Sequence, residues 1–197
     1  MARVSLEGRR ISFTVAWTAE DFTRALLRNS HAFLKTRPVE LAAIKLVQNK
    51  FPEADCMDFL KSVCRWGNRA GTAGLVSKNN SRATIQRQML AAWAALQEDR
   101  ISDALAAMTA LNGLDVSFGS KHLRMLAPSK AVVLDSIIDF GLGYGRTATG
   151  YEEFLSDCIS IRDFLNGPGG SINPVDLDGP WRVADVEMAI YSKLRGL

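Results

Sequence analysis

The sequence of 197 residues contains only three cysteines, two histidines and six prolines, and each scarcity excludes a class of protein. Cys56, Cys64 and Cys158 cannot form a disulfide framework or supply the thiolates of an iron–sulfur cluster. They are typical of reduced, buried thiols in a cytoplasmic protein. Because the two histidines and the cysteines are scattered, no metal-ligand spacing exists. We therefore expect neither a metal ion nor a cofactor.

Long apolar runs are also missing. No segment approaches the roughly 18 residues that a membrane-spanning helix needs. The N-terminal segment, MARVSLEGRR, lacks the apolar core of a signal peptide. The composition, with 47% apolar and 23% charged residues, is that of an ordinary globular chain. These features predict a soluble cytoplasmic protein without a membrane partner.

Acidic residues are absent from one long stretch, although the formal net charge of the whole chain is only +3. Between Lys61 and Gln97 there is no Asp or Glu, and the basic residues in this stretch are Lys61, Arg65, Arg69, Lys78, Arg82 and Arg87. A stretch of one charge sign attracts phosphate, which predicts affinity for nucleic acid that does not depend on sequence. The alternative is a solvated basic face that serves solubility.

The hydrophobic pattern predicts a short N-terminal β-hairpin followed by helices. In residues 1–17, apolar side chains alternate on either side of Glu7-Gly8-Arg9, as expected for two short strands. From residue 18 to residue 197 the periodicity becomes helical, so we expect a single all-α domain whose helices pack pairwise. A loop is expected over residues 66–80 because this stretch holds three glycines. The expected helices are 18–27, 38–48, 52–67, 81–96, 101–111, a short one from about 120, 130–141, 151–165 and 181–194.

The segment from Ile101 to Asp139 has the most informative pattern. An amphipathic helix ends at Asn112-Gly113, and Gly119-Ser120-Lys121 is expected to open a second, short helix. Two helices joined by a glycine-containing turn present free backbone N–H groups that bind phosphate without regard to base sequence. Many helical hairpins contain a glycine turn, so this feature alone does not identify a function.

Lys121 and Asp135 are the candidate catalytic pair. At the start of a helix, the helix dipole and partial burial both lower the pKa of a lysine, which leaves a neutral amine. Such an amine is a nucleophile toward an electrophilic carbon such as C1′ of a sugar. A carboxylate at Asp135 would stabilise positive charge that develops on the sugar ring. The alternatives are that Lys121 is a surface lysine and that Asp135 caps a helix or forms a salt bridge.

The order of these features resembles that in the helix-hairpin-helix DNA glycosylases, and within them the 8-oxoguanine DNA glycosylase fold. In that family a lysine at the start of the second hairpin helix attacks C1′ and a later aspartate assists, and Lys121 and Asp135 match these positions. The last two expected helices resemble a compact bacterial subfamily found beside anti-phage signalling genes. Three features differ from the family pattern. Residues 114–118 separate Gly113 from Gly119, the lysine and the aspartate are closer in sequence than usual, and at most a hairpin replaces the usual N-terminal sheet domain.

The resemblance and the basic stretch together suggest nine residues for contact with nucleic acid. Asn79 and Asn80 are similar to the asparagine stretch with which these enzymes fill the space left by an extruded base. Trp66 is a candidate for stacking on that base, although tryptophan at a helix end is more often part of the core. His122 is a candidate for contact with phosphate, with a helix-surface position as the alternative. The full set is Gly113, Gly119, Ser120, His122, Asn79, Asn80, Arg82, Trp66 and Arg69.

The resemblance implies a DNA glycosylase that removes an oxidised purine through a Schiff base on lysine, with strand cleavage as a further step. Its partner is nucleic acid, DNA above all, or a nucleotide. The main alternative is a non-catalytic accessory protein of a defence operon that uses the same fold to bind nucleic acid, a nucleotide or an operon-encoded protein. A third alternative is a helical DNA-binding regulator.

Overall fold

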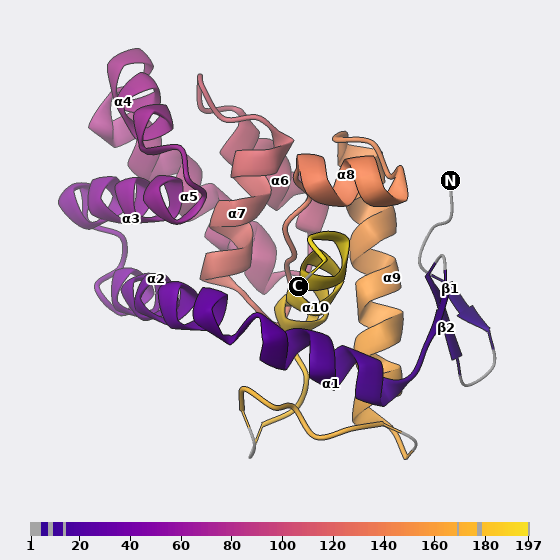
Figure 1. Cartoon of the computed structure of the whole chain (residues 1–197). Helices are drawn as coiled ribbons and strands as arrows, with labels where there is room; N and C mark the ends of the chain where they lie inside the picture. Colours follow the sequence, from indigo (N-terminus) through magenta and orange to yellow (C-terminus); the bar gives the residue numbers. More distant parts are fainter. Residues whose placement is uncertain (1–4, 8–9, 14, 169, 177–178, 197) are drawn as a thin grey trace.

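The computed structural model describes residues 5–7, 10–13, 15–168, 170–176 and 179–196. In these residues the chain forms ten helices, preceded by three short strands (Figure 1). The protein is therefore all-α in class, as the helical periodicity predicts. The elements are β1 (Ser5–Glu7), β2 (Arg10–Phe13), β3 (Val15–Trp17), α1 (Ala19–Arg28), α2 (Ser30–Gln48), α3 (Glu53–Trp66), α4 (Ala70–Asn79), α5 (Arg82–Gln97), α6 (Ile101–Thr109), α7 (Val116–Leu126), α8 (Ser136–Leu142), α9 (Ala148–Asn166) and α10 (Val183–Leu194).

The strands form one antiparallel sheet in the order β1-β2-β3, and β1 lies beside α9 at the edge of the molecule (Figure 1). The expected hairpin contains two strands, whereas the structure has a third, and the turn at residues 8–9 lies outside the described residues. Trp17 at the end of β3 is buried, and its ring meets the ring of Phe22 edge-on at 4.6 Å. This contact joins the sheet to α1.

Side-chain caps explain where several helices begin. Thr18 and Asp21 form a capping box at the start of α1, and Ser81 accepts a hydrogen bond from the backbone of Thr84 at the start of α5. Such caps satisfy backbone N–H groups that have no partner within the helix. The predicted starts of these two helices are confirmed.

Two of the expected helix starts are wrong by six residues or more. Pro38 does not open a helix but lies inside α2, which already begins at Ser30. A proline at this position removes the backbone hydrogen bond to the carbonyl of Leu34. Leu34 is exposed, so water can satisfy this carbonyl and the helix continues. The helix expected over residues 130–141 begins only at Ser136, because Asp135 caps α8 at that point and residues 131–135 are extended.

The predicted loop over residues 66–80 is also wrong, because α4 occupies most of it. Gly71 and Gly74 lie on the exposed side of this helix, and Ala73 and Val76 pack inward toward the core. Helix α4 packs against α3. The tertiary contact thus outweighs the roughly 1 kcal/mol by which each glycine disfavours a helix relative to alanine.

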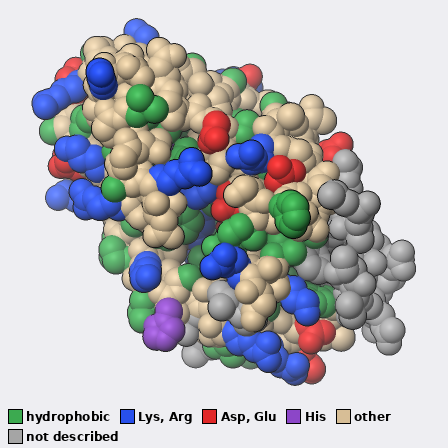
Figure 2. Space-filling view, turned by 45° about the horizontal axis from the view of Figure 1, so that its top comes forward, with side chains coloured by type: hydrophobic (Ala, Val, Ile, Leu, Met, Phe, Trp, Pro, Cys, Tyr) green, Lys and Arg blue, Asp and Glu red, His purple; other side chains and the backbone are tan. Residues whose placement is uncertain are grey.

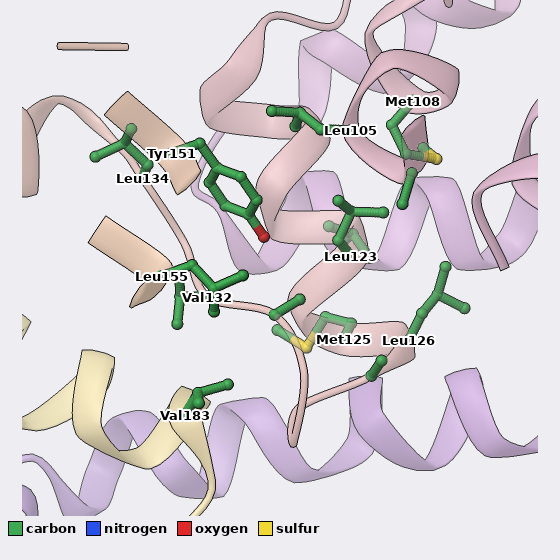
Figure 3. Close-up of a cluster of buried hydrophobic side chains, with 14 of the residues drawn as sticks. Leu105, Met108, Leu123, Met125, Leu126, Val132, Leu134, Tyr151, Leu155 and Val183 are labelled. Carbon is green, nitrogen blue, oxygen red and sulfur yellow. The ribbon is translucent and has the colours of Figure 1, made fainter. Parts of the chain in front are cut away.

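Helix α7 lies at the centre of the molecule and is buried along most of its length. Figure 3 shows its residues Leu123, Met125 and Leu126 packed among side chains from α6, α9 and α10. The extended segment 131–134 lies beside α7, with all four residues buried. Position and orientation of the α7 side chains are therefore fixed by packing on several sides. Among the described residues, no helix is long and apolar enough to cross a membrane.

Candidate active site

A cavity of about 320 Å³ lies where α2, α3, α7 and α10 meet. Its volume is at the lower end of the roughly 300–1,000 Å³ found for small-molecule sites. Figure 2 shows a face that is hollowed near its centre, with Lys and Arg side chains around the hollow. The charged and aromatic residues that line the cavity are His31, Lys35, Trp66, Lys121, Asp135, Glu187, Tyr191 and Arg195.

Lys121 enters this cavity from the second turn of α7, and not from the first turn as the sequence predicts. The helix begins earlier because the side chain of Asp115 caps it and accepts a hydrogen bond from the backbone of Phe118. Lys121 is only 6% exposed. Its Nζ atom donates to Ser117 Oγ at 3.1 Å and lies 5.0 Å from the ring centre of Phe118.

The structure brings Asp135 to Lys121, as the catalytic hypothesis requires. Asp135 Oδ2 lies 3.5 Å from Lys121 Nζ, and both residues line the cavity. The other carboxylate oxygen, Oδ1, accepts hydrogen bonds from the backbone of Ile137 at 3.0 Å and Ile138 at 3.3 Å. Asp135 therefore caps α8 with one oxygen and contacts the amine with the other, so its position is fixed by the helix start.

Burial lowers the pKa of Lys121, because the charged form loses hydration. The negative charge of Asp135 opposes this shift, as do the carboxyl groups of Glu187 and Asp115 in their ionised forms. The sequence predicts this direction and burial as one of its two causes, whereas the other predicted cause, a place in the first turn of the helix, is wrong because Lys121 lies in the second turn. A lowered pKa increases the fraction of neutral amine, which is the nucleophilic form.

Glu187 on α10 is a cavity residue that the sequence prediction missed. It is 5% exposed, and burial raises the pKa of its carboxyl group to about 8. The only sequence signal is a glutamate within the otherwise apolar stretch from Val186 to Ile190. Helical periodicity shows that such a position faces inward, but it does not show that a cavity lies there.

Trp66 forms part of the cavity wall, and it is held there by α2 and α7. Its indole Nε1 donates to Thr36 Oγ1 at 2.9 Å, and the guanidinium of Arg124 lies 5.8 Å from its ring centre. Arg124 is fully buried and pairs with Glu40 at 2.6 Å. Glu40 also contacts Arg182 at 3.3 Å, so α2, α7 and the start of α10 are joined behind the wall. Trp66 is thus partly buried and still available to a ligand in the cavity.

Three of the residues predicted to bind nucleic acid are buried and cannot contact it in this structure. Gly119 lies inside α7 and packs against Thr109 of α6. The hydroxyl of Ser120 donates a hydrogen bond to the carbonyl oxygen of Ser117 and accepts one from the backbone N–H of Leu134. His122 is fully buried, and its Nδ1 lies 2.7 Å from the carbonyl oxygen of Phe118. Burial lowers the pKa of His122 to about 4, so its ring is neutral at pH 7. The predicted phosphate site at Gly119-Ser120 is therefore wrong, because these residues lie inside a helix.

The remaining predicted residues lie at the surface but outside the cavity lining. Gly113 is exposed in the turn between α6 and α7 and has a left-handed backbone with φ of 105°. The side-chain amide of Asn80 donates hydrogen bonds to the carbonyl oxygens of Val76 and Asn112, and its oxygen accepts one from the backbone N–H of Asn112. The side chain therefore joins the end of α4 to this turn. Exposed side chains are those of Asn79, Arg82 and Arg69. Their contact with nucleic acid remains a prediction.

Comparison with known proteins gives no relative: no family model, curated protein or solved structure matches the chain. Among the residues that the structure describes, no group of three or more His, Cys, Asp and Glu side chains converges as a metal site would require.

Proposed function

We propose that the protein is a DNA glycosylase that removes an oxidised purine, with Lys121 as nucleophile. One observation carries the proposal: Lys121 Nζ and Asp135 Oδ2 lie 3.5 Å apart at the wall of a cavity that is also lined by an aromatic ring. A buried lysine of lowered pKa beside a fixed carboxylate is the arrangement that attack on a sugar carbon requires.

The proposed reaction begins when a modified base is extruded from the helix into the cavity. The lone pair of Lys121 Nζ forms a bond to C1′ as the bond between C1′ and the base nitrogen breaks. The base leaves with that electron pair and takes up a proton, and Asp135 stabilises the positive charge on the sugar. Loss of a proton from Nζ and opening of the ring then give a Schiff base. Abstraction of a proton from C2′ of this intermediate would cleave the strand by β-elimination.

The charge around the cavity supports a nucleic acid as the substrate. Lys35 and Arg195 are exposed at the cavity, and Arg69 is exposed at the start of α4, close in sequence to the cavity residues Trp66 and Asn68. Such side chains bind phosphate at the sugar–phosphate backbone and hold the substrate without specifying its base. The pair α6 and α7 with its turn corresponds to the hairpin of the proposed helix-hairpin-helix bundle.

Borohydride trapping tests the proposal. Duplex DNA carrying 8-oxoguanine opposite cytosine, and the same duplex with an abasic site, are incubated with the protein and sodium borohydride, which reduces a Schiff base to a stable covalent adduct. We expect an adduct with the wild type, none with Lys121→Gln, and wild-type yield with Lys45→Gln, which removes an exposed amine of α2. Absence of an adduct with the wild type, where a known glycosylase gives one, would overturn the proposal.

A non-catalytic binding role in a defence operon is the second candidate, and one observation favours it. Lys35 and Arg195 are exposed at the cavity, where they can bind phosphate whether or not Lys121 reacts. A protein with this role would bind the same duplexes, and Lys121→Gln would leave protection from phage intact. Variants of the basic surface, such as Arg69→Glu, would abolish protection.

A further inference from the structure

The cavity holds a carboxyl group to which the proposed reaction gives no role. Glu187 extends from α10 into the cavity that holds Lys121 and Asp135. We infer that Glu187 is the acid that protonates the departing base, an inference that rests on the glycosylase reaction proposed above. The base nitrogen needs this proton as its bond to C1′ breaks, and the proposed reaction already assigns Asp135 to the positive charge on the sugar.

The groups around Glu187 come from four elements. Lys121 and Arg124 on α7 attract its negative charge, whereas Asp135 at the start of α8 repels it. Tyr151 and Cys158 on α9 and Tyr191 on α10 are the other titratable groups within its electrostatic reach. Burial raises the pKa of all three, so they are neutral at pH 7. The charged residues among these are therefore Lys121, Arg124 and Asp135, and Lys35 and Arg195 are further charged residues of the cavity lining.

Arg124 does not hold Glu187 in its ionised form, although it is the strongest attractive charge nearby. Its Nη1 atom is paired with Glu40 at 2.6 Å, whereas its Nε and Nη2 atoms have no hydrogen-bond partner among the described residues, Glu187 included. Loss of hydration then dominates at Glu187, and the pKa of about 8 leaves most molecules with a protonated carboxyl group at neutral pH. A proton donor with a pKa near the working pH is the most effective general acid.

The two carboxyl groups of the cavity thus have different environments and different tasks. Asp135 accepts two backbone N–H bonds and contacts the amine of Lys121, so it serves as the anion that stabilises positive charge. Glu187 is buried against apolar residues of α10 and serves as the acid. Pairs of titratable groups whose environments separate their protonation states mark acid and base roles in enzymes.

The proton that the departing base takes up and the proton that Lys121 loses are both transferred within the cavity. Glu187 transfers its proton to the base nitrogen as the bond to C1′ breaks, and it becomes a carboxylate. Attack on C1′ leaves Lys121 Nζ positively charged with one proton to lose. That proton returns the Glu187 carboxylate to its acid form, so the net transfer is from the amine to the departing base.

The test compares a substrate that has a base to lose with one that has none. Glu187→Gln keeps the size of the neutral carboxyl group but has no acidic proton. We expect release of 8-oxoguanine from the duplex to fall by about 100-fold or more, the usual contribution of a general acid. Borohydride trapping on the abasic duplex should be unchanged, because no base has to be protonated. Lys121→Gln should lose both activities.

Each other outcome has a definite meaning. Wild-type base release by Glu187→Gln would overturn the acid role, whereas loss of trapping on the abasic duplex as well would show that Glu187 only positions Lys121. If the wild type neither releases base nor forms an adduct on the abasic duplex, the glycosylase proposal itself fails. The pH profile gives a second readout: base release by the wild type should fall as the pH rises past about 8, and the residual activity of Glu187→Gln should lack this decline.

Discussion

Gly67 lies directly against the side chain of Lys121. A Cβ atom at this position would stand 3.1 Å from Lys121 Cδ and 3.1 Å from Phe118 Cε1. The backbone of Gly67 has a φ of −73°, which any residue adopts, so space and not backbone conformation makes glycine suitable here. The end of α3 therefore helps to set the position of the amine.

Gly67→Ala should displace the Lys121 side chain by a few tenths of an ångström and slow Schiff-base formation more than it alters stability. Borohydride trapping rates and thermal unfolding check both parts. Gly74→Ala is the matched control, since a Cβ there meets no atom within 4 Å. That variant should keep its trapping rate and gain about 0.5–1 kcal/mol in stability, because alanine favours the helix. Equal trapping rates for the two variants would contradict the prediction.

Asp135 allows its two contacts to be separated by substitution. Asn at position 135 can still cap α8 but carries no charge, whereas Ala loses the cap as well. Asp135→Asn should therefore reduce base release and trapping with little change in the free energy of unfolding. Asp135→Ala should lose activity and also about 1 kcal/mol of stability. Denaturant unfolding and trapping assays on both variants measure this, and full activity of Asp135→Asn would exclude an electrostatic role.

Glu187 should make stability depend on pH. Its pKa is raised from 4.5 to about 8 by folding, so between these values the native chain holds a proton that the unfolded chain releases. Stability from this group is present below pH 4.5 and is lost as the pH rises through about 8, by up to about 1.4 kcal/mol per pH unit. Glu187→Gln does not titrate, so its advantage over the wild type should grow with pH.

The measurement is urea unfolding of both proteins between pH 6.5 and 8. Below this window the buried His122, whose pKa is about 4, acts in the opposite direction and loses stability as the pH falls. The lowered pKa of Lys121 also gives a slope of opposite sign, but this lysine is present in both proteins and largely cancels in the difference. Parallel curves for the wild type and Glu187→Gln would show that the carboxyl is not protonated in the native state.

Asn79 and Asn80 should differ although they are neighbours. The Asn80 side chain makes one hydrogen bond to Val76 in α4 and two to the backbone of Asn112 in the α6–α7 turn, and Asn79 is exposed. Asn80→Ala should lower stability by about 0.5–1.5 kcal/mol, because the hydrogen bonds of its side chain are lost. Asn79→Ala should leave stability unchanged and is the variant that tests contact with DNA. Thermal unfolding and duplex binding measure both, and an unchanged melting temperature for Asn80→Ala would contradict its structural role.

The parts of the fold that the sequence predicts are those governed by local chemistry. Thr18 and Ser81 mark helix starts because their side chains accept hydrogen bonds from backbone only three residues away. Asp115 carries the same signal for α7, but the glycine pattern places the expected start of this helix at Gly119. Helix capping by Asp135, one of the alternatives for this residue, is confirmed. Glycine content also concealed α4, whose stability comes from contact with α3.

The candidate site was predictable only in part. Lys121 and Asp135 are predicted from their residue types and from a resemblance to a known family, and the structure places them together. Glu187 was missed because its importance depends on which helices surround a cavity, and sequence spacing does not contain this information. The burial of Ser120 and His122 has the same origin, since neighbours distant in sequence enclose α7 on nearly every side.

The ion pairs of Glu40 with Arg124 and Arg182 lie behind the cavity wall and connect three helices. These ion pairs hold the cavity in its shape before a ligand binds, so little conformational entropy is lost on binding. Selectivity among ligands then comes from steric exclusion, because a rigid cavity wall does not adapt to a ligand whose shape does not fit. Arg124→Met removes the ion pair between α7 and Glu40 and makes the cavity wall less rigid. This variant should therefore bind a wider range of ligands before its affinity for the preferred ligand falls.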